Sequence, residues 1–542
     1  MKIKRIGVAA IALAAAGALA LSGCATSSEP AAPEGDATAV ITTNGNEPQN
    51  PLIPTNTNEV GGGKILDSIF AGLIYYDADG APVNDMAESI ETDDAQTYTI
   101  TIKTDQTFTN GEPVTAESFV KAWNYGAALD NAQLSSYFFE SIEGFSYDEN
   151  VAELSGLEVV DDTTFTVKLS QPESDFPLRL GYSAFYPLPE AAWEDIEAFG
   201  ENPIGNGPYM LDGEGAWKHN ERIGLVKNED YQGPRQAVNG GLDIIFYATQ
   251  DAAYADLQGG NLDVIDAIPD SALATYETDF EDRSVNQAVA VFQSFVIPDR
   301  LAHFGGEEGK LRRAAISHAI NREEITDVIF AGTRTPAHDF TSPVIDGYSE
   351  EIPGAEVLEY DPEAAVELWA EADAIAPWSG SFQIGYNADG GHQGWVDAVA
   401  NQLKNELSID ASGAPYPTFA EFRTAITDRQ IQTAFRTGWQ GDYPSLSNFL
   451  GPIYKTGAGS NDGDYSNAEF DALLEEGLGE TDIEAGIEKF QQSQEILFED
   501  LPAIPLWYAT ANGAWSEAVD NVQFGWNGVP LHYEITKAAD SE

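Results

Sequence analysis

Apolar and polar residues alternate with period two in two separate stretches of the chain. Threonines separate the apolar residues from Tyr98 to Ile102, and a second alternation runs from Phe165 to Leu169. Each stretch follows a pair of aspartates, a turn signal, so the pattern predicts half-buried antiparallel strands. Between them, Asn110-Gly111 predicts a tight hairpin turn. We therefore expect one α/β unit over roughly 72–190.

Helical signals dominate the second half of the chain. Asn321 with Glu324 predicts a capping box, and Asp361-Pro362 predicts a capped helix start with Pro at its first position. Strand-like runs alternate with these helices, which favours α/β lobes. The remaining helical signals are Thr115 ahead of Phe119 and Trp123, Ile325, Val328 and Ile329 after Asn321, and Trp395, Val399 and Leu403 at spacing four; the strand-like runs are 242–247 and 503–508.

The N-terminus reads as a targeting segment rather than as part of the fold. Basic residues precede an apolar run from Ile6 to Leu21, which is too short and too rich in Ala and Gly for a good membrane span. The run ends in Leu21-Ser22-Gly23-Cys24, which resembles a bacterial lipobox, and Cys24 is the chain's single cysteine. We expect a signal peptide over 1–23, a lipid on Cys24 and a flexible linker over 24–38; the alternative is a chance cysteine behind an ordinary secretion signal.

Composition excludes several classes of function. The 542 residues carry 89 Asp and Glu against 26 Lys and Arg, a formal charge of -63, so nucleic acid would be repelled over most of the surface. One cysteine and six scattered histidines leave no evident zinc or iron–sulfur ligand set. The sequence contains no nucleophile elbow and no phosphate loop. We expect neither an enzyme nor a bound cofactor or metal.

Six short motifs occur in chain order along the sequence. They are Ile69-Phe-Ala-Gly-Leu73, Phe108-Thr-Asn-Gly-Glu-Pro-Val-Thr-Ala-Glu117, Gly205-Asn-Gly-Pro-Tyr209, Gly259-Gly-Asn-Leu-Asp263, Leu311-Arg-Arg-Ala-Ala315 and Gly438-Trp-Gln-Gly-Asp-Tyr-Pro444. Each motif alone is ordinary turn chemistry. Their order and spacing, from about 40 to 530, resemble the peptide-binding receptors of ABC importers, solute-binding protein family 5.

The resemblance implies a two-lobed α/β fold of the periplasmic-binding-protein type (class II) with an extra inserted α/β domain. It further implies a monomeric receptor, lipid-anchored at Cys24 on the outer face of the cytoplasmic membrane. Its expected partners are short peptides and the membrane permease of an importer. The expected parts are lobe I over 39–71, 191–286 and 509–542, the inserted domain over 72–190, and lobe II over 287–508.

The same resemblance assigns ligand contacts. Asp442 matches the family's partner for the peptide α-amino group, and Arg436 matches a position that faces the bound peptide, where it would hold the carboxylate. Gly438, Trp439 and Gln440 would offer main chain, and Asn58-Glu59-Val60 matches the opposing strand. His392 resembles a second site for ligand termini.

Ordinary structural roles compete with these assignments. Asp442 could cap the turn before Tyr443-Pro444, Arg436 could serve a salt bridge, and His392 could fix a helix start. Tryptophans such as Trp439 and Trp395 are more often core than pocket wall. The chain also departs from the family where Phe295-Val296-Ile297-Pro298 lacks an asparagine, which makes the following Arg300 a candidate for a longer peptide's carboxylate.

Other solutes remain alternatives to peptides. Within the family, the ligand could be an oligosaccharide or another small solute. Outside it, a secreted surface hydrolase or an adhesin would fit an exported acidic chain.

Overall fold

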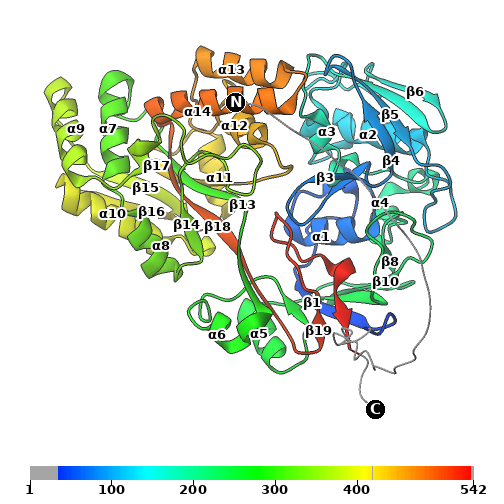
Figure 1. Cartoon of the computed structure of the whole chain (residues 1–542). Coiled ribbons are helices and arrows are strands. Elements are labelled where there is room, and N and C mark those ends of the chain that lie inside the picture. Colours follow the sequence, from blue (N-terminus) through cyan, green and yellow to red (C-terminus); the bar gives the residue numbers. More distant parts are fainter. Residues whose placement is uncertain (1–34, 418, 539–542) are drawn as a thin grey trace, which may run out of the picture. The chain divides into compact units, whose positions relative to one another are not determined.

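A twelve-stranded mixed sheet runs through the part of the chain that the computed structural model describes, residues 35–417 and 419–538 (Figure 1). The expected signal peptide, the lipidated Cys24 and most of the expected linker lie outside these residues. In spatial order the sheet contains β16 (Ala411–Tyr416), β15 (Phe382–Asn387), β17 (Ala434–Gln440), β13 (Ser284–Val296), β18 (Ala503–Trp515), β12 (Val264–Ile265), β1 (Val40–Gly45), β11 (Gly241–Phe246), β10 (Arg222–Lys227) and β8 (Tyr209–Leu211), with β14 (Arg334–Pro336) beside β18 and β9 (Trp217–Lys218) beside β10.

Two long strands, β13 and β18, connect the two halves of this sheet. They pair antiparallel from Ser284 opposite Ala514 to Val296 opposite Ala503, with a register shift between Ala288 and Phe292. At one end β18 also pairs with β12, and at the other end β13 also pairs with β17. Figure 1 shows both strands passing from the helices around α7 (Gly306–His318) and α10 (Gln393–Leu407) to the region of β1. These strands therefore carry the chain between two separately packed regions.

A second sheet confirms the two strands expected from period-two alternation. It has four antiparallel strands, in the order β4 (Ala87–Glu91), β5 (Thr97–Ile102), β7 (Thr164–Lys168) and β6 (Leu157–Asp161). Helix α2 (Ala116–Ala127) begins after Thr115, which forms a capping box with Ser118. Phe119 and Trp123 of α2 both pack against Phe165, so alternation and helical spacing meet in one core.

Helices cover the sheet in the second half, and the expected N-caps Asn321 and Asp361 are present. The capping box expected of Asn321 and Glu324 is wrong, because the amide of Asn321 donates to Gln402 instead. Asn321 accepts the amide of Glu324 at the start of α8 (Arg322–Phe330), and Asp361 accepts two amides at the start of α9 (Pro362–Ile375). Val328 is 73% exposed and Ile329 40% exposed, so the apolar positions expected to bury α8 do so only in part. The other helices here are α11 (Phe419–Thr427), α12 (Leu446–Tyr454), α13 (Ala468–Gly479) and α14 (Ile483–Asp500).

Buried apolar residues form two large clusters and one small one. The first joins α1 (Val60–Ile69), the four-stranded sheet and β1. The second lies around α7, α10, residues 290–296 of β13 and residues 503–508 of β18. The third packs α5 (Gln250–Gln258) and α6 (Tyr276–Phe280) beside β12. The expected domain boundaries stay predictions. The remaining elements are α3 (Phe176–Arg179), α4 (Ile196–Glu201), and the strand pairs β2 (Ile74–Tyr76) with β3 (Pro82–Asn84) and β19 (Val519–Asp520) with β20 (Thr536–Lys537).

No helix within the described residues has the length and apolar character needed to cross a bilayer.

Candidate ligand-binding cavity

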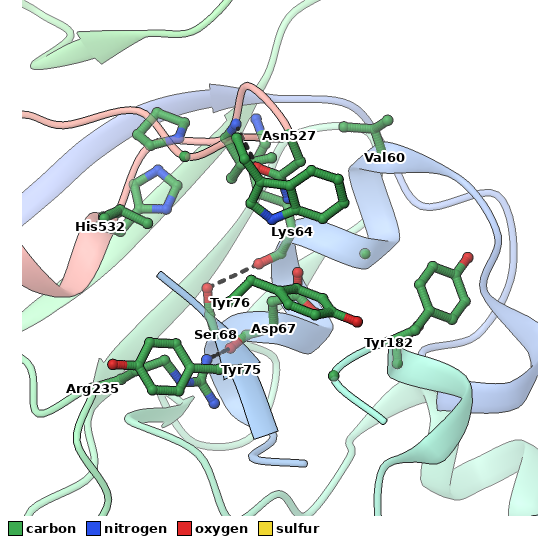
Figure 2. A pocket seen from close by; sticks show the side chains of 18 of the residues that line it. Val60, Lys64, Asp67, Ser68, Tyr75, Tyr76, Tyr182, Arg235, Asn527 and His532 are labelled. Carbon is green, nitrogen blue, oxygen red and sulfur yellow. Dashed lines mark hydrogen bonds between the residues drawn. The ribbon is translucent and has the colours of Figure 1, made fainter. Parts of the chain in front are cut away.

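A cavity of about 300 Å³ lies where several segments of the chain converge. One face of α1, the strand β2, the turn Gly181–Ser183, the end of β17 and the C-terminal loop 525–533 line it, together with Pro208, Tyr209 and Arg235 (Figure 2). Its volume is at the lower end of the range for ligand pockets, and its walls mix aromatic rings with charged groups. Such a lining can hold an apolar body and orient a charged group.

Helix α1 presents one face to the cavity because Val60, Lys64 and Asp67 recur at helical spacing. Glu59 caps this helix by accepting the amide of Gly62 with both carboxylate oxygens, at 2.9 and 3.0 Å. The ammonium of Lys64 is buried in an ion pair with Asp266 and also donates to the carbonyl of Asn44. The positive charge of Lys64 is therefore already matched inside the protein.

The second cation of the wall, Arg235, is matched in the same way. Its Nε donates to Asp85 at 3.0 Å, and its two Nη atoms donate to the backbone carbonyls of Asp67 and Phe70. The guanidinium also lies 5.6 Å from the ring centre of Tyr75. Arg235 therefore links the end of α1 to Asp85, which follows β3, and to Tyr75 of β2.

Asp442 stands directly after β17, at the edge of the cavity. Its amide donates to Asn448 Oδ1 at 2.9 Å, and Asn448 Nδ2 donates back to Asp442 Oδ2 at 3.1 Å. No ion pair to Asp442 occurs among the described residues. Burial raises the pKa of this carboxyl to about 6, and the bond from Asn448 opposes that rise. The site thus holds a carboxylate that a ligand cation would stabilise.

The backbone of β17 has one strand-paired edge beside Asp442. Residues from Phe435 to Gln440 pair with β13, whereas the parallel pairing with β15 covers only Ala434 and Phe435. Among the described strands, none pairs with residues 436–440 on the side away from β13. An extended ligand could therefore add to this edge.

The structure brings five of the expected ligand residues to the cavity wall: Asn58, Glu59, Val60, Gln440 and Asp442. The expectation of an opposing strand at Asn58–Val60 is wrong, because Glu59 is the helix cap and Val60 is the first residue of α1. Glu59 itself keeps an extended backbone, with φ of -130° and ψ of 155°.

The other four expected residues do not line this cavity. Gly438 and Trp439 lie on β17, and the indole nitrogen of Trp439 donates to Asn448. The guanidinium of Arg436 donates to Asn387 Oδ1 at 2.7 and 3.0 Å and lies over the ring of Phe422.

His392 precedes α10, where its ring accepts a bond from the indole of Trp395. Trp395 itself is buried in the core. These contacts fit the expected alternative of a histidine at a helix start.

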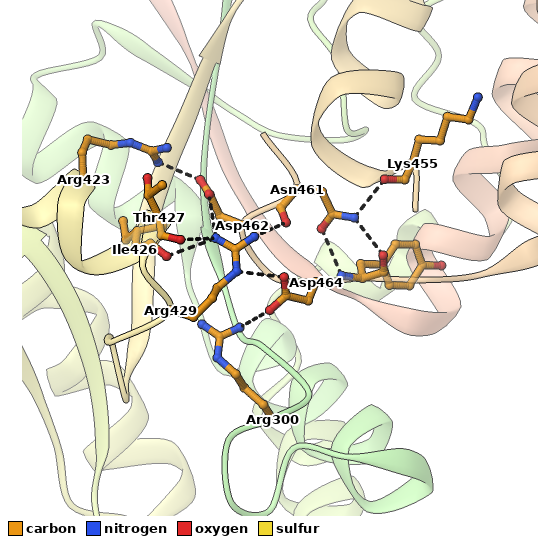
Figure 3. A network of polar contacts seen from close by, with 10 residues as sticks. Arg300, Arg423, Ile426, Thr427, Arg429, Lys455, Asn461, Asp462 and Asp464 are labelled. Carbon is orange, nitrogen blue, oxygen red and sulfur yellow. Dashed lines mark hydrogen bonds and ion pairs between the residues drawn. The ribbon is translucent and has the colours of Figure 1, made fainter. Parts of the chain in front are cut away.

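Arg300, a candidate for a longer ligand's carboxylate, belongs to a separate polar network (Figure 3). Its Nη1 donates to Asp464 at 3.0 Å, and Arg429 donates to the same aspartate at 2.8 Å. Arg423 and Arg429 both pair with Asp462 on the same loop. The network fastens this loop to α11 and accounts for Arg300 without a ligand.

Sequence reasoning missed Asp67, Tyr76, Tyr182, Arg235 and His532 as cavity residues. Only the helical spacing after Glu59 could have pointed to one of them, Asp67. No group of three His, Cys, Asp or Glu within 35–417 and 419–538 is arranged to hold a metal ion.

Comparisons with known proteins agree with this geometry. Residues 81–461 match the family model described as bacterial extracellular solute-binding proteins, family 5 Middle. The oligopeptide-binding protein OppA of Bacillus subtilis is 25% identical over 87% of this chain and 88% of its own length. The dipeptide-binding protein DppE of the same species is 27% identical over 90% and 91%.

A solved structure, Haemophilus influenzae OppA in complex with RPPGFSPFR, superposes with a TM-score of 0.72. It is 23% identical in sequence over 93% of this chain and 100% of its own. At this identity the likeness shows the fold, which is the two-lobed class II α/β fold expected from the motifs.

Proposed function

We propose a peptide receptor on one premise: the chain belongs to the bacterial extracellular solute-binding proteins, family 5. Members of this family are binding proteins, and relatives along nearly the whole chain carry names that state oligopeptide or dipeptide binding. The chain captures short peptides outside the cytoplasm and delivers them to an ABC importer, without catalysing a reaction.

One observation carries the proposal: the carboxylate of Asp442 faces a cavity beside an open strand edge, with no cation of its own among the described residues. A peptide supplies what this arrangement lacks. Its α-ammonium pairs with Asp442 in a charge-assisted hydrogen bond, and its backbone adds to residues 438–440 of β17. Asn58 and Glu59 contact the first residue from the other side.

The ligand's carboxylate end extends away from the cavity along β17. Arg436 lies six residues before Asp442 on that strand, and His392 precedes the neighbouring helix. Both are proposed contacts for the terminal carboxylate once the lobes close. Arg436 would then shift its donors from Asn387 to the peptide.

The cellular setting follows from the N-terminal motif. We propose that Cys24 is lipidated, that 25–38 form the linker, and that the monomeric receptor is held at the outer face of the cytoplasmic membrane. Its protein partner there is the importer's permease.

Mass spectrometry of molecules that copurify with the protein tests the proposal. Short peptides with free amino termini are expected. Calorimetry of matched peptides with free and N-acetylated termini then isolates the amine contact, because acetylation removes the charge and leaves the remaining residues unchanged. Copurification of sugars, or equal affinity for both forms, would overturn the proposal.

A further inference from the structure

The cavity contains a second carboxylate whose charge is not matched. Asp67 lies on α1, one turn after Lys64 (Figure 2), and lines the same cavity as Asp442. One of its oxygens accepts the hydroxyl of Tyr186 at 2.8 Å. No ion pair to Asp67 occurs among the described residues, and its other oxygen accepts no hydrogen bond there.

The two cations near Asp67 form ion pairs with other carboxylates. Lys64 is paired with Asp266 and Arg235 with Asp85, and neither of these aspartates lines the cavity. The wall therefore presents unpaired carboxylates to the cavity, whereas its two cations are paired with aspartates that do not line the cavity. Burial raises the pKa of Asp67, and the hydrogen bond from Tyr186 and the charge of Arg235 oppose that rise.

An unpartnered buried nitrogen lies in the same wall. His532 is 4% exposed and lines the cavity, and its Nε2 has no hydrogen-bond partner among the described residues. Burial and the nearby Lys64 lower the pKa of His532 to about 3, so the ring is neutral and its Nε2 is a donor or an acceptor according to the tautomer. In either state a buried polar nitrogen without a partner is costly unless a ligand supplies one.

Aromatic rings complete the wall around Asp67. Tyr76 stands edge-on to Trp526 at 5.4 Å between ring centres, and its hydroxyl donates to the carbonyl of Leu178. Tyr182 lies on the other side of Asp67 from Tyr75 (Figure 2), and Tyr186, four residues further along the chain, also lines the cavity and donates to Asp67. Such rings pack well against a methylene chain and attract a cation at its end.

We propose that Asp67, with the rings around it, forms a second cation subsite, and that the receptor prefers peptides whose first residue is basic. This inference rests on the proposed peptide function and names the substrate class. The α-ammonium binds Asp442, and the ammonium or guanidinium of the first side chain binds Asp67. A cavity of about 300 Å³ suits one such residue rather than a whole peptide.

The test compares Lys-Ala-Ala with norleucine-Ala-Ala by calorimetry. The two side chains have the same methylene stem, and only the lysine carries a charge. The wild type is expected to bind the lysine peptide on the order of tenfold or more tightly, as for a hydrogen bond between charged groups. In an aromatic pocket without Asp67, the norleucine peptide would bind equally well or better, because lysine must give up its hydration.

Two variants and one further peptide separate this contact from the general acidity of the protein. Asp67→Asn is expected to abolish the preference while keeping the acceptor for Tyr186. Asp79→Asn makes the same change of charge at an exposed turn outside the cavity and is expected to preserve the preference. Ala-Ala-Lys has the same net charge as Lys-Ala-Ala and is expected to lack the gain.

Each failure has its own signature. If neither lysine nor norleucine peptide binds the folded wild type, the peptide function itself fails. If both bind with equal affinity, or Ala-Ala-Lys gains as much as Lys-Ala-Ala, the peptide function stands and the second cation subsite is refuted. If Asp67→Asn does not fold, the comparison of peptides on the wild type and on Asp79→Asn still decides whether the receptor prefers a basic first residue.

Discussion

Replacing Asp442 by Asn should change stability and affinity in opposite directions. The asparagine keeps the shape of the side chain and an oxygen for Asn448, and it removes only the charge. A buried carboxylate that serves only to bind the ligand destabilises the folded, ligand-free protein. A carboxylate that caps a turn stabilises it. The variant therefore distinguishes the two roles of Asp442 considered from the sequence.

The free-energy cost of the Asp442 charge in the empty protein follows from its pKa, which burial raises from 3.8 to about 6. A difference of this size makes ionisation about 3 kcal/mol less favourable in the folded empty protein than in the unfolded chain. The cost is absent below pH 4, develops between pH 4 and 6, and is complete above pH 6. Because water still reaches part of the side chain, Asp442→Asn should stabilise the empty protein by about 1 to 3 kcal/mol at pH 7.

Affinity for peptides with a free amino group should fall by roughly two powers of ten in the same variant, since a charge-assisted hydrogen bond is lost. In the wild type, lowering the pH below 6 should weaken these peptides about tenfold per unit, because Asp442 must lose a proton to bind. Above about pH 8 the peptide amine loses its charge and affinity should fall again. The affinity of N-acetylated peptides should show neither the loss below pH 6 nor the loss above about pH 8.

Thermal unfolding of the ligand-free protein at pH 4 and pH 7, with calorimetry across the pH range, measures both effects. The reasoning is refuted if Asp442→Asn lowers the melting temperature at pH 7 and weakens free and acetylated peptides alike. Asp442 would then be a structural residue.

Three further predictions concern the anchor, the lobes and the polar network. Cys24→Ala should move the protein from the membrane fraction to the medium, or leave it unprocessed; unchanged fractionation contradicts lipidation. A tightly bound peptide should reduce the radius of gyration in small-angle scattering, because contacts from both lobes favour the closed state, and an unchanged radius at saturation argues for a rigid surface. Arg429→Ala should cost about 1 kcal/mol in urea unfolding because it breaks bonds to both Asp462 and Asp464. Lys489→Ala, which breaks a single surface pair, should cost less, and equal losses would show that the network adds nothing.

Local patterns predicted elements best where one short-range rule decides the conformation. Alternation with threonine located β5 because one face of that strand is buried, and Asp361 located the start of α9 because an Asp before Pro satisfies free helix amides. Burial was harder to predict. The apolar residues Val328 and Ile329 follow helical spacing but are 73% and 40% exposed, since the neighbouring elements do not cover that face of α8 completely.

The candidate site was predicted in part, and by resemblance rather than by pattern. The run from Phe435 to Asp442 pointed to Asp442, which lines the cavity, and to Arg436, which does not. The segment before α1 was located correctly but assigned the wrong conformation. A residue such as Glu59 satisfies both a strand-like spacing and a helix cap, and only its hydrogen bonds to Gly62 distinguish them.

Asp67 shows why the rest of the site needed a structure. With 89 acidic and 26 basic residues, most carboxylates in this chain have no cation, and on the surface water makes that cheap. An unpaired acid is therefore uninformative in the sequence. It becomes informative inside a cavity, where the protein has matched Lys64 and Arg235 and left Asp67 and Asp442 unmatched. Because a buried charge without a partner costs stability, its retention at two points of one small cavity argues for a ligand that brings two positive charges.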